Sequence, residues 1–177
     1  MDYNQINIPK PKGLWRLLFI IALFLVVVPF LTPKIKEKIS AVKQSGIEQL
    51  ADKEGYFTVV DVLSGDTIEL LGGVKVKYIG IDIPDDCYIN QATDKNKELL
   101  INKKVKLIAD INGEDENGNF LRYAYLPDGT FINLELIKNG YATVVNVDPN
   151  LKFKDEFEQA EKEAIVEKKG LWGECIN

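Results

Sequence analysis

The chain has 177 residues, no histidine and a formal net charge of −5. The absence of histidine excludes a Ser-His-Asp triad and removes the most common zinc ligand. With 46% hydrophobic and 28% charged residues, the composition is that of a globular protein rather than a disordered one. The length accommodates one ordinary domain and an additional segment.

Charge is distributed unevenly along the chain. Residues 1–54 contain eight Lys/Arg and five Asp/Glu, a net charge of +3, whereas residues 55–177 contain fourteen and twenty-two, a net charge of −8. Nucleic-acid affinity depends largely on Lys and Arg side chains that neutralise phosphates. The acidic part is therefore a poor overall match for a polyanion, although a local basic groove is compatible with it.

The first predicted element is a transmembrane anchor over residues 14–32. Residues 17–31 form an uninterrupted apolar run, and Trp15 and Arg16 suit the membrane interface. Nineteen helical residues extend about 28 Å, which is close to the thickness of the hydrocarbon core. A cleaved signal peptide is the alternative, but the end of the run lacks the small residues of a cleavage site. Residues 1–13 are then a short N-terminal tail.

Residues 33–54 are predicted to form a juxtamembrane helix or spacer, because apolar residues recur there at roughly helical spacing among charges. Basic residues flank the anchor on both sides and specify its orientation only weakly. A short tail before a signal-like span favours an extracytoplasmic position for the domain, residues 55–177. Its Cys87 and Cys175 are the only cysteines of the chain. They form either one disulfide, which requires an oxidising compartment, or two free thiols.

The domain begins with strand patterns. β-Branched and aromatic residues predict a meander of three strands, with turns at residues 64–65 (Ser-Gly) and 72–73 (Gly-Gly). Two further strands follow a predicted helix. The five predicted strands are Tyr56–Val62, Thr67–Leu71, Val74–Ile81, Lys104–Ala109 and Arg122–Leu126.

Three helices are predicted in the same domain. The first covers residues 91–102, a short second one is capped by Asn133 and ends before Gly140, and a charged third one covers residues 153–169. Five strands with a helix between the third and the fourth predict an α+β fold. This fold is a five-stranded OB-type β-barrel with about three packed helices, preceded by the single N-terminal transmembrane helix.

Two aspartates at strand ends are candidate metal ligands. Asp66 lies in the turn of residues 64–67 (Ser-Gly-Asp-Thr), and Asp82 is followed by Ile-Pro and then by Asp85. Carboxylates in this arrangement suit a hard cation such as Ca²⁺. Alternatively, Asp66 is only a turn-forming residue, and Lys77 and Asp85 form an ordinary surface ion pair.

Residues 56–173 resemble the staphylococcal (thermonuclease-type) nuclease family in the content and the order of their motifs. The motifs lie at residues 65–67 (Gly-Asp-Thr), 78–84 (Tyr-Ile-Gly-Ile-Asp-Ile-Pro), 121–133, 136–142 and 170–172 (Gly-Leu-Trp). The resemblance covers about two-thirds of the chain. It implies the nuclease fold and Ca²⁺-dependent hydrolysis of phosphodiesters in DNA or RNA.

By position, the resemblance implies that Asp66, Asp82 and the backbone carbonyl of Ile83 hold the Ca²⁺. A family glutamate positions the attacking water, and Asp85, one methylene shorter, stands at that position.

Two family arginines stabilise the charge of the phosphate in the transition state. Their positions hold Lys77, a point charge without the bidentate fork of arginine, and Asn119, which is uncharged. Arg122 lies nearby in the sequence, but strand alternation predicts that it points to the opposite face from Asn119.

These substitutions lead to alternative functional hypotheses. The first is a membrane-anchored, Ca²⁺-dependent phosphodiesterase with reduced activity on DNA or RNA, because losing one preorganised donor costs about 10²–10³ in rate. The second is a catalytically inactive nuclease-fold module that binds nucleic acid or protein, and a third is an envelope scaffold. The predicted partners are the lipid bilayer, through residues 14–32, and DNA or RNA.

Overall fold

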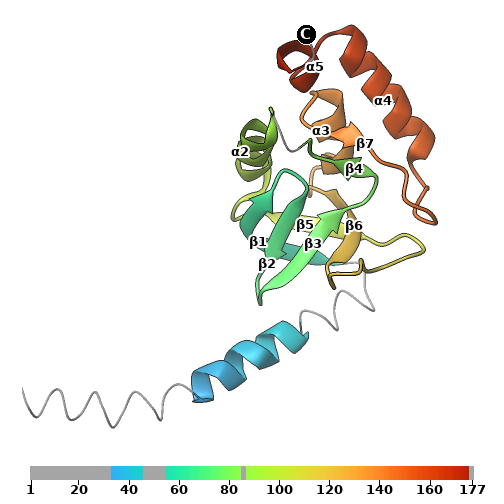
Figure 1. Ribbon diagram of the computed structural model, residues 1–177. Coiled ribbons are helices and arrows are strands. Elements are labelled where there is room, and N and C mark those ends of the chain that lie inside the picture. Colours follow the sequence, from blue (N-terminus) through green and yellow to red (C-terminus); the bar gives the residue numbers. More distant parts are fainter. Residues whose placement is uncertain (1–32, 46–54, 85–86, 176–177) are drawn as a thin grey trace, which may run out of the picture. The chain divides into compact units, whose positions relative to one another are not determined.

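The structure, a computed structural model, describes residues 33–45, 55–84 and 87–175 (Figure 1). The first of these ranges is a helix, in the segment predicted to be a juxtamembrane helix or spacer. The predicted anchor, residues 14–32, and the tail before it lie outside the described residues. Within the described ranges, no helix is both long and apolar enough to cross a membrane.

Five strands close into a barrel in the order β1-β2-β3-β6-β5 (Figure 1). Neighbouring strands run antiparallel, except that β3 and β6 run parallel. The predicted five-stranded barrel is therefore confirmed. The strands are β1 (Tyr56–Ser64), β2 (Thr67–Leu70), β3 (Val74–Tyr78), β5 (Lys104–Ile108) and β6 (Phe120–Tyr125).

The barrel interior is filled by the apolar residues that alternate along these strands. Because successive strand residues point to opposite faces, one face of each strand enters the core. Val59, Ile68 and Val76, from three neighbouring strands, are completely buried, and Leu107 and Ala124 continue the core on the other side.

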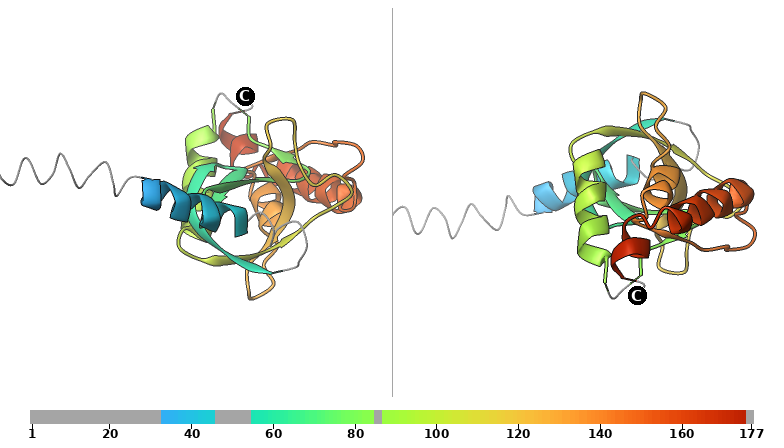
Figure 2. Two further views of the ribbon diagram at one scale, coloured as in Figure 1. Left: turned by 90° about the horizontal axis from the view of Figure 1, so that it is seen from below. Right: turned by 90° about the horizontal axis from the view of Figure 1, so that it is seen from above.

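Within residues 55–84 and 87–175, four helices accompany the barrel, where about three were predicted. They are α2 (Ile89–Leu100), α3 (Ile132–Lys138), α4 (Lys154–Val166) and the short α5 (Leu171–Glu174). Helix α2 packs against β1, whereas α3 and α4 pack against each other. The views from below and above show α2 on a different side of the barrel from α4 (Figure 2).

The third strand was predicted to reach Ile81, and this prediction is wrong. The strand ends at Tyr78 because Gly80 has a φ of +80°, and a Cβ atom there would lie 2.7 Å from the Phe157 ring. The chain then enters a separate strand, β4 (Ile81–Asp82), which pairs with β7 (Thr143–Val144). Asp82 consequently lies in this two-stranded sheet and not at the end of a barrel strand.

The predicted capping role of Asn133 is also wrong, because α3 already begins at Ile132. Asn133 is completely buried. Its Nδ2 donates to the carbonyl of Ile79 at 2.9 Å, and its Oδ1 accepts from the Ala124 N–H at 3.0 Å. The amide therefore joins α3 to β6 and to the segment that leads to β4.

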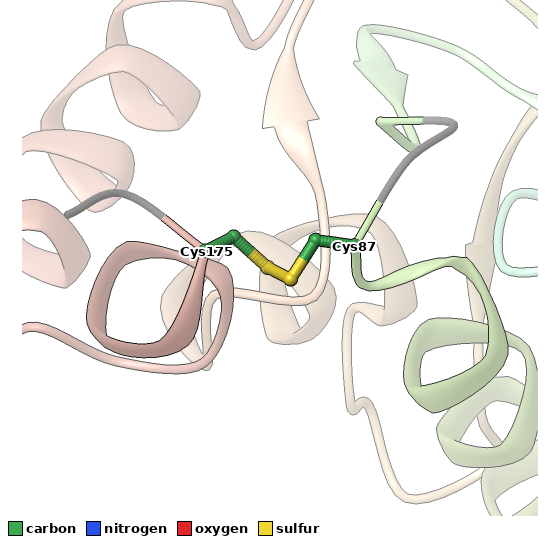
Figure 3. Close-up of a disulfide and its surroundings, with 2 residues drawn as sticks. All are labelled: Cys87 and Cys175. Atoms are coloured by element: carbon green, nitrogen blue, oxygen red, sulfur yellow. A yellow bond between two sulfur atoms is a disulfide. The ribbon is translucent and has the colours of Figure 1, made fainter.

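A disulfide joins Cys87 to Cys175, with the Cα atoms 5.8 Å apart (Figure 3). The sequence left open a disulfide or two free thiols, and the structure contains the disulfide. The bridge connects the chain just before α2 to the end of α5, across a sequence separation of 88. Closing a loop of this length stabilises the fold by about 4–5 kcal/mol in the chain-entropy model.

Replacing Asn133 with alanine should lower the free energy of unfolding by at least about 2 kcal/mol. The substitution leaves the Ala124 N–H and the Ile79 carbonyl buried without partners, each at a cost of about 1–3 kcal/mol. Urea denaturation followed by circular dichroism measures the change. The control is Asn90→Ala on the exposed face of α2, which should shift stability by less than about 0.5 kcal/mol. Equal stability of the two variants would contradict the assignment.

Candidate active site

Asp66 is a buried carboxylate with a partner for each oxygen. It lies in the turn between β1 and β2 and is only 6% exposed. The hydroxyls of Ser64 and Thr67 both donate to its Oδ1, and the Lys77 Nζ lies 3.3 Å from its Oδ2. A buried charge is tolerated when it is paired and hydrogen-bonded, and Asp66 meets both conditions. Asp66 therefore does not only form a turn; its side chain is also the centre of an ion pair and two hydrogen bonds.

The strand register places Lys77 beside Asp66. Thr67 of β2 pairs with Lys77 of β3, and the Tyr78 N–H donates to the Asp66 carbonyl at 2.9 Å. The Lys77 side chain is 38% exposed, so its ammonium reaches both the carboxylate and solvent. Asp85, considered earlier as its ion-pair partner, lies outside the described residues.

Gly65 brings the Asp66 turn against the segment that follows Asp82. A Cβ atom at Gly65 would lie 2.8 Å from the Ala92 Cβ and 2.9 Å from the Ile83 side chain. Only glycine allows so close an approach. The turn that carries Asp66 and the residue whose carbonyl is the third predicted ligand are therefore packed against each other.

A buried amide in α2 holds the start of the same turn. Asn96 is completely buried; its Nδ2 donates to the Ser64 carbonyl at 3.0 Å, and its Oδ1 accepts from the Tyr78 hydroxyl at 3.0 Å. Burial raises the pKa of Tyr78 far above its ordinary value, so the hydroxyl stays protonated as a donor. Sequence analysis missed Asn96. The available signal is its place between Ala92 and Leu100, at four-residue spacing on the buried face of the helix.

A cleft with a volume of about 310 Å³ opens beside these groups. Three residues with charged side chains line it, namely Asp82, Asp115 and Lys77. The other lining residues are Tyr78, Ile79, Gly80, Ile81, Leu121, Val145, Val147 and Asn150. The cleft therefore combines an apolar wall with three charged groups, two of which, Lys77 and Asp82, were predicted site residues.

Asn119 does not line this cleft but a separate one, and its side chain is bonded to Asp115. Its Nδ2 donates to Oδ2 of Asp115 at 2.8 Å, and the N–H groups of Asn117 and Asn119 donate to Oδ1. Partial burial opposes ionisation of Asp115, but these hydrogen bonds and the charge of Lys77 together hold its pKa below the ordinary value. Sequence analysis missed Asp115, although an aspartate that opens the polar turn of residues 115–119 is a recognisable turn signal.

The domain, residues 55–177, has no arginine that lines this cleft. Arg122 is its only arginine, and this side chain is buried. The guanidinium donates to the carbonyls of Gly113 and Leu121 and lies 5.1 Å from the centre of the Phe120 ring. Leu121 lines the cleft and Arg122 does not.

The predicted metal ligands fit a hard cation by their chemistry. Asp66, Asp82 and the Ile83 carbonyl offer only oxygen atoms, which are the ligands that Ca²⁺ prefers. The packing of Gly65 on Ile83 brings two parts of this set together. Within the described residues, no three His, Cys, Asp or Glu side chains are grouped to hold a metal. Among the described residues, further ligands would therefore be backbone oxygens, with water completing the set.

Comparison with known proteins identifies the family. The model of the staphylococcal nuclease homologue family matches residues 75–174. The chain belongs to this family. The match covers most of the barrel and the helices that follow it, including Lys77, Asp82 and Asp115.

Curated relatives of the family carry nuclease names. The chain is 34% identical to a thermonuclease of Staphylococcus hyicus over 130 residues, which are 67% of this chain and 76% of the relative. It is 36% identical over 128 residues to the SPbeta prophage-derived endonuclease YokF of Bacillus subtilis, covering 65% of this chain and 43% of the relative. Endonuclease YncB of the same organism is 34% identical over 128 residues, with 65% and 60% covered. The two Bacillus relatives thus extend well beyond the shared region.

Gly65→Ala should destabilise the fold and separate the Asp66 turn from Ile83. The added methyl group overpacks the contact, at a cost of about 1–3 kcal/mol. Thermal unfolding measures the loss. Gly129→Ala is the control, because a Cβ atom there meets nothing within 4 Å, although its φ of +92° adds some strain. If Gly65→Ala proves no more destabilising than Gly129→Ala, the close packing of the turn is wrong.

Proposed function

We propose that the protein is a membrane-anchored, Ca²⁺-dependent phosphodiesterase that cleaves DNA or RNA at a reduced rate. The observation that carries the proposal is the pair of Asp66 and Lys77 beside a cleft lined by Asp82, in a chain of the staphylococcal nuclease family. A cleft with carboxylates for a cation and an ammonium for a phosphate has the components of metal-assisted phosphodiester hydrolysis.

Asp66, Asp82 and the Ile83 carbonyl would hold the Ca²⁺. When bound, the ion supplies Lewis-acid polarisation of a phosphate oxygen and activation of a water molecule. Lys77 would bind a non-bridging phosphate oxygen and stabilise the negative charge that develops there. Asp85 would orient the attacking water and accept its proton.

The reduced rate follows from the two substituted arginine positions. Lys77 offers a single point of charge where a guanidinium offers two parallel donors. Asn119 offers no charge, and its amide is already bonded to Asp115. Because each lost donor to the transition state costs about 10²–10³ in rate, activity well below that of an enzyme with both arginines is expected.

The anchor and the location of the domain are part of the proposal. The apolar run of residues 17–31 supports insertion of residues 14–32 into a lipid bilayer. The disulfide between Cys87 and Cys175 supports an extracytoplasmic position for the domain, since disulfides persist mainly in oxidising compartments.

A second candidate function is a catalytically inactive module that binds nucleic acid or protein. The hydrogen bonds between Asn119 and Asp115 favour it, because they commit the second arginine position to the structure of a loop. The net charge of −8 over residues 55–177 also opposes strong binding of a polyanion in the absence of metal.

Cleavage of single-stranded DNA by the purified protein should require Ca²⁺ and stop in EDTA. Asp66→Ala should lower the rate by at least about 10²-fold, because loss of a ligand misplaces the ion. A fluorescent oligonucleotide separated on a gel provides the measurement. Asp94→Ala, which removes an exposed carboxylate of α2, should leave the rate unchanged. Absence of cleavage of both DNA and RNA at millimolar Ca²⁺ would refute the enzymatic proposal.

Restoring the family residues distinguishes the two candidates. The triple variant Lys77→Arg, Asp85→Glu, Asn119→Arg should raise a measurable wild-type rate by at least about 10²-fold. Under the second candidate, the wild type is inactive and activity emerges only in the triple variant. The same cleavage assay measures both rates, and a wild-type rate already equal to that of the triple variant would contradict the cost assigned to the substitutions.

A further inference from the structure

The Lys77 ammonium lies where a divalent ion would need to approach Asp66. One carboxylate oxygen, Oδ1, already accepts the hydroxyls of Ser64 and Thr67. The other, Oδ2, lies 3.3 Å from the Lys77 Nζ. A Ca²⁺ ion binds its oxygen ligands at about 2.3–2.6 Å. An ion on Oδ2 would therefore share one oxygen with the ammonium, and the two cations would repel each other.

The Lys77 side chain can leave this position while its backbone stays in place. Its backbone is fixed by pairing with Thr67 on one side and Leu121 on the other, but its side chain is 38% exposed. A lysine ammonium on a flexible stem readily takes up alternative positions.

A second carboxylate is available to the displaced ammonium. Asp115 lines the same cleft as Lys77. The charge of Lys77 contributes, after the hydrogen bonds from Asn119 and Asn117, to the lowered pKa of Asp115. The two charges therefore already attract each other, and both residues line the cleft together with Asp82.

We propose that Lys77 is a tethered counter-ion, which neutralises Asp66 in the metal-free protein and moves away from Asp66, towards Asp115, when a divalent ion binds. The proposal rests on the proposed function only in taking Asp66 as a metal ligand. Metal affinity is then set by competition between the ion and the Lys77 ammonium for Asp66. Metal binding also releases the ammonium from Asp66, which leaves it available to a phosphate in the cleft.

Removal of the ammonium tests the competition. In calorimetric titration of the full-length protein with Ca²⁺ alone, in mild detergent, Lys77→Met should bind about tenfold more tightly than the wild type, a difference of about 1.4 kcal/mol. Lys75→Met is the matched control, because it removes the same charge from an exposed position of the same strand. Its Ca²⁺ affinity should equal that of the wild type.

A second measurement follows Ca²⁺ binding in the wild-type protein itself, and a variant serves only to assign one signal. Lysine ammonium groups are ¹³C-methylated, and the Lys77 signal is assigned by its loss in Lys77→Arg. Addition of Ca²⁺ should shift the Lys77 signal in parallel with saturation of the site, whereas the Lys75 signal should stay in place. A Lys77 signal that does not move while Ca²⁺ binds would overturn the displacement.

Unchanged or weaker Ca²⁺ binding by Lys77→Met overturns the proposal, as does the absence of binding by both proteins at millimolar Ca²⁺. These outcomes are separate from catalysis. A protein that binds Ca²⁺ more tightly without Lys77, yet cleaves no nucleic acid, refutes the proposed function and supports the counter-ion. Cleavage by the wild type together with unchanged Ca²⁺ affinity in Lys77→Met supports the proposed function and refutes the counter-ion.

Discussion

The site depends on compensation of one buried carboxylate. Asp66 is almost completely removed from solvent, and an unpaired charge there would cost several kcal/mol. Two hydroxyls and the Lys77 ammonium provide the compensation. Each has its own requirement: the hydroxyls need the tight turn between β1 and β2, and the ammonium needs the β2–β3 register. The turn and the strand register together therefore compensate the Asp66 charge.

Groups that are distant in the sequence support the turn that carries Asp66. Gly65 allows contact with Ile83, and Asn96 bonds the Ser64 carbonyl from α2. Asn133 performs the equivalent role on the other side, where it holds the segment that leads to Asp82. The two predicted aspartate ligands are thus positioned by separate buried amides.

Local patterns were sufficient to predict the barrel and the place of Asp66. Alternating apolar residues and glycine turns are properties of short segments, so the strands could be recognised without knowledge of their neighbours. The early end of β3 could not be recognised in this way, because it results from contact between Gly80 and Phe157, far apart in the chain. Asn133 was misassigned for the same reason: its cap-like sequence position is overridden by two long-range hydrogen bonds. The partner of Lys77 likewise depends on the strand register and not on neighbouring residues.

The proposed function requires that Asp66 and Asp82 hold one Ca²⁺ ion together. Calorimetric titration of the full-length protein with Ca²⁺, alongside Asp66→Ala, Asp82→Ala and the control Asp94→Ala, provides the most direct test. Saturable binding to one site is expected in the wild type and in the control, and this binding should be lost in both other variants. Binding that survives Asp66→Ala and Asp82→Ala, or no saturable binding by the wild type at millimolar Ca²⁺, would contradict this role of the two aspartates.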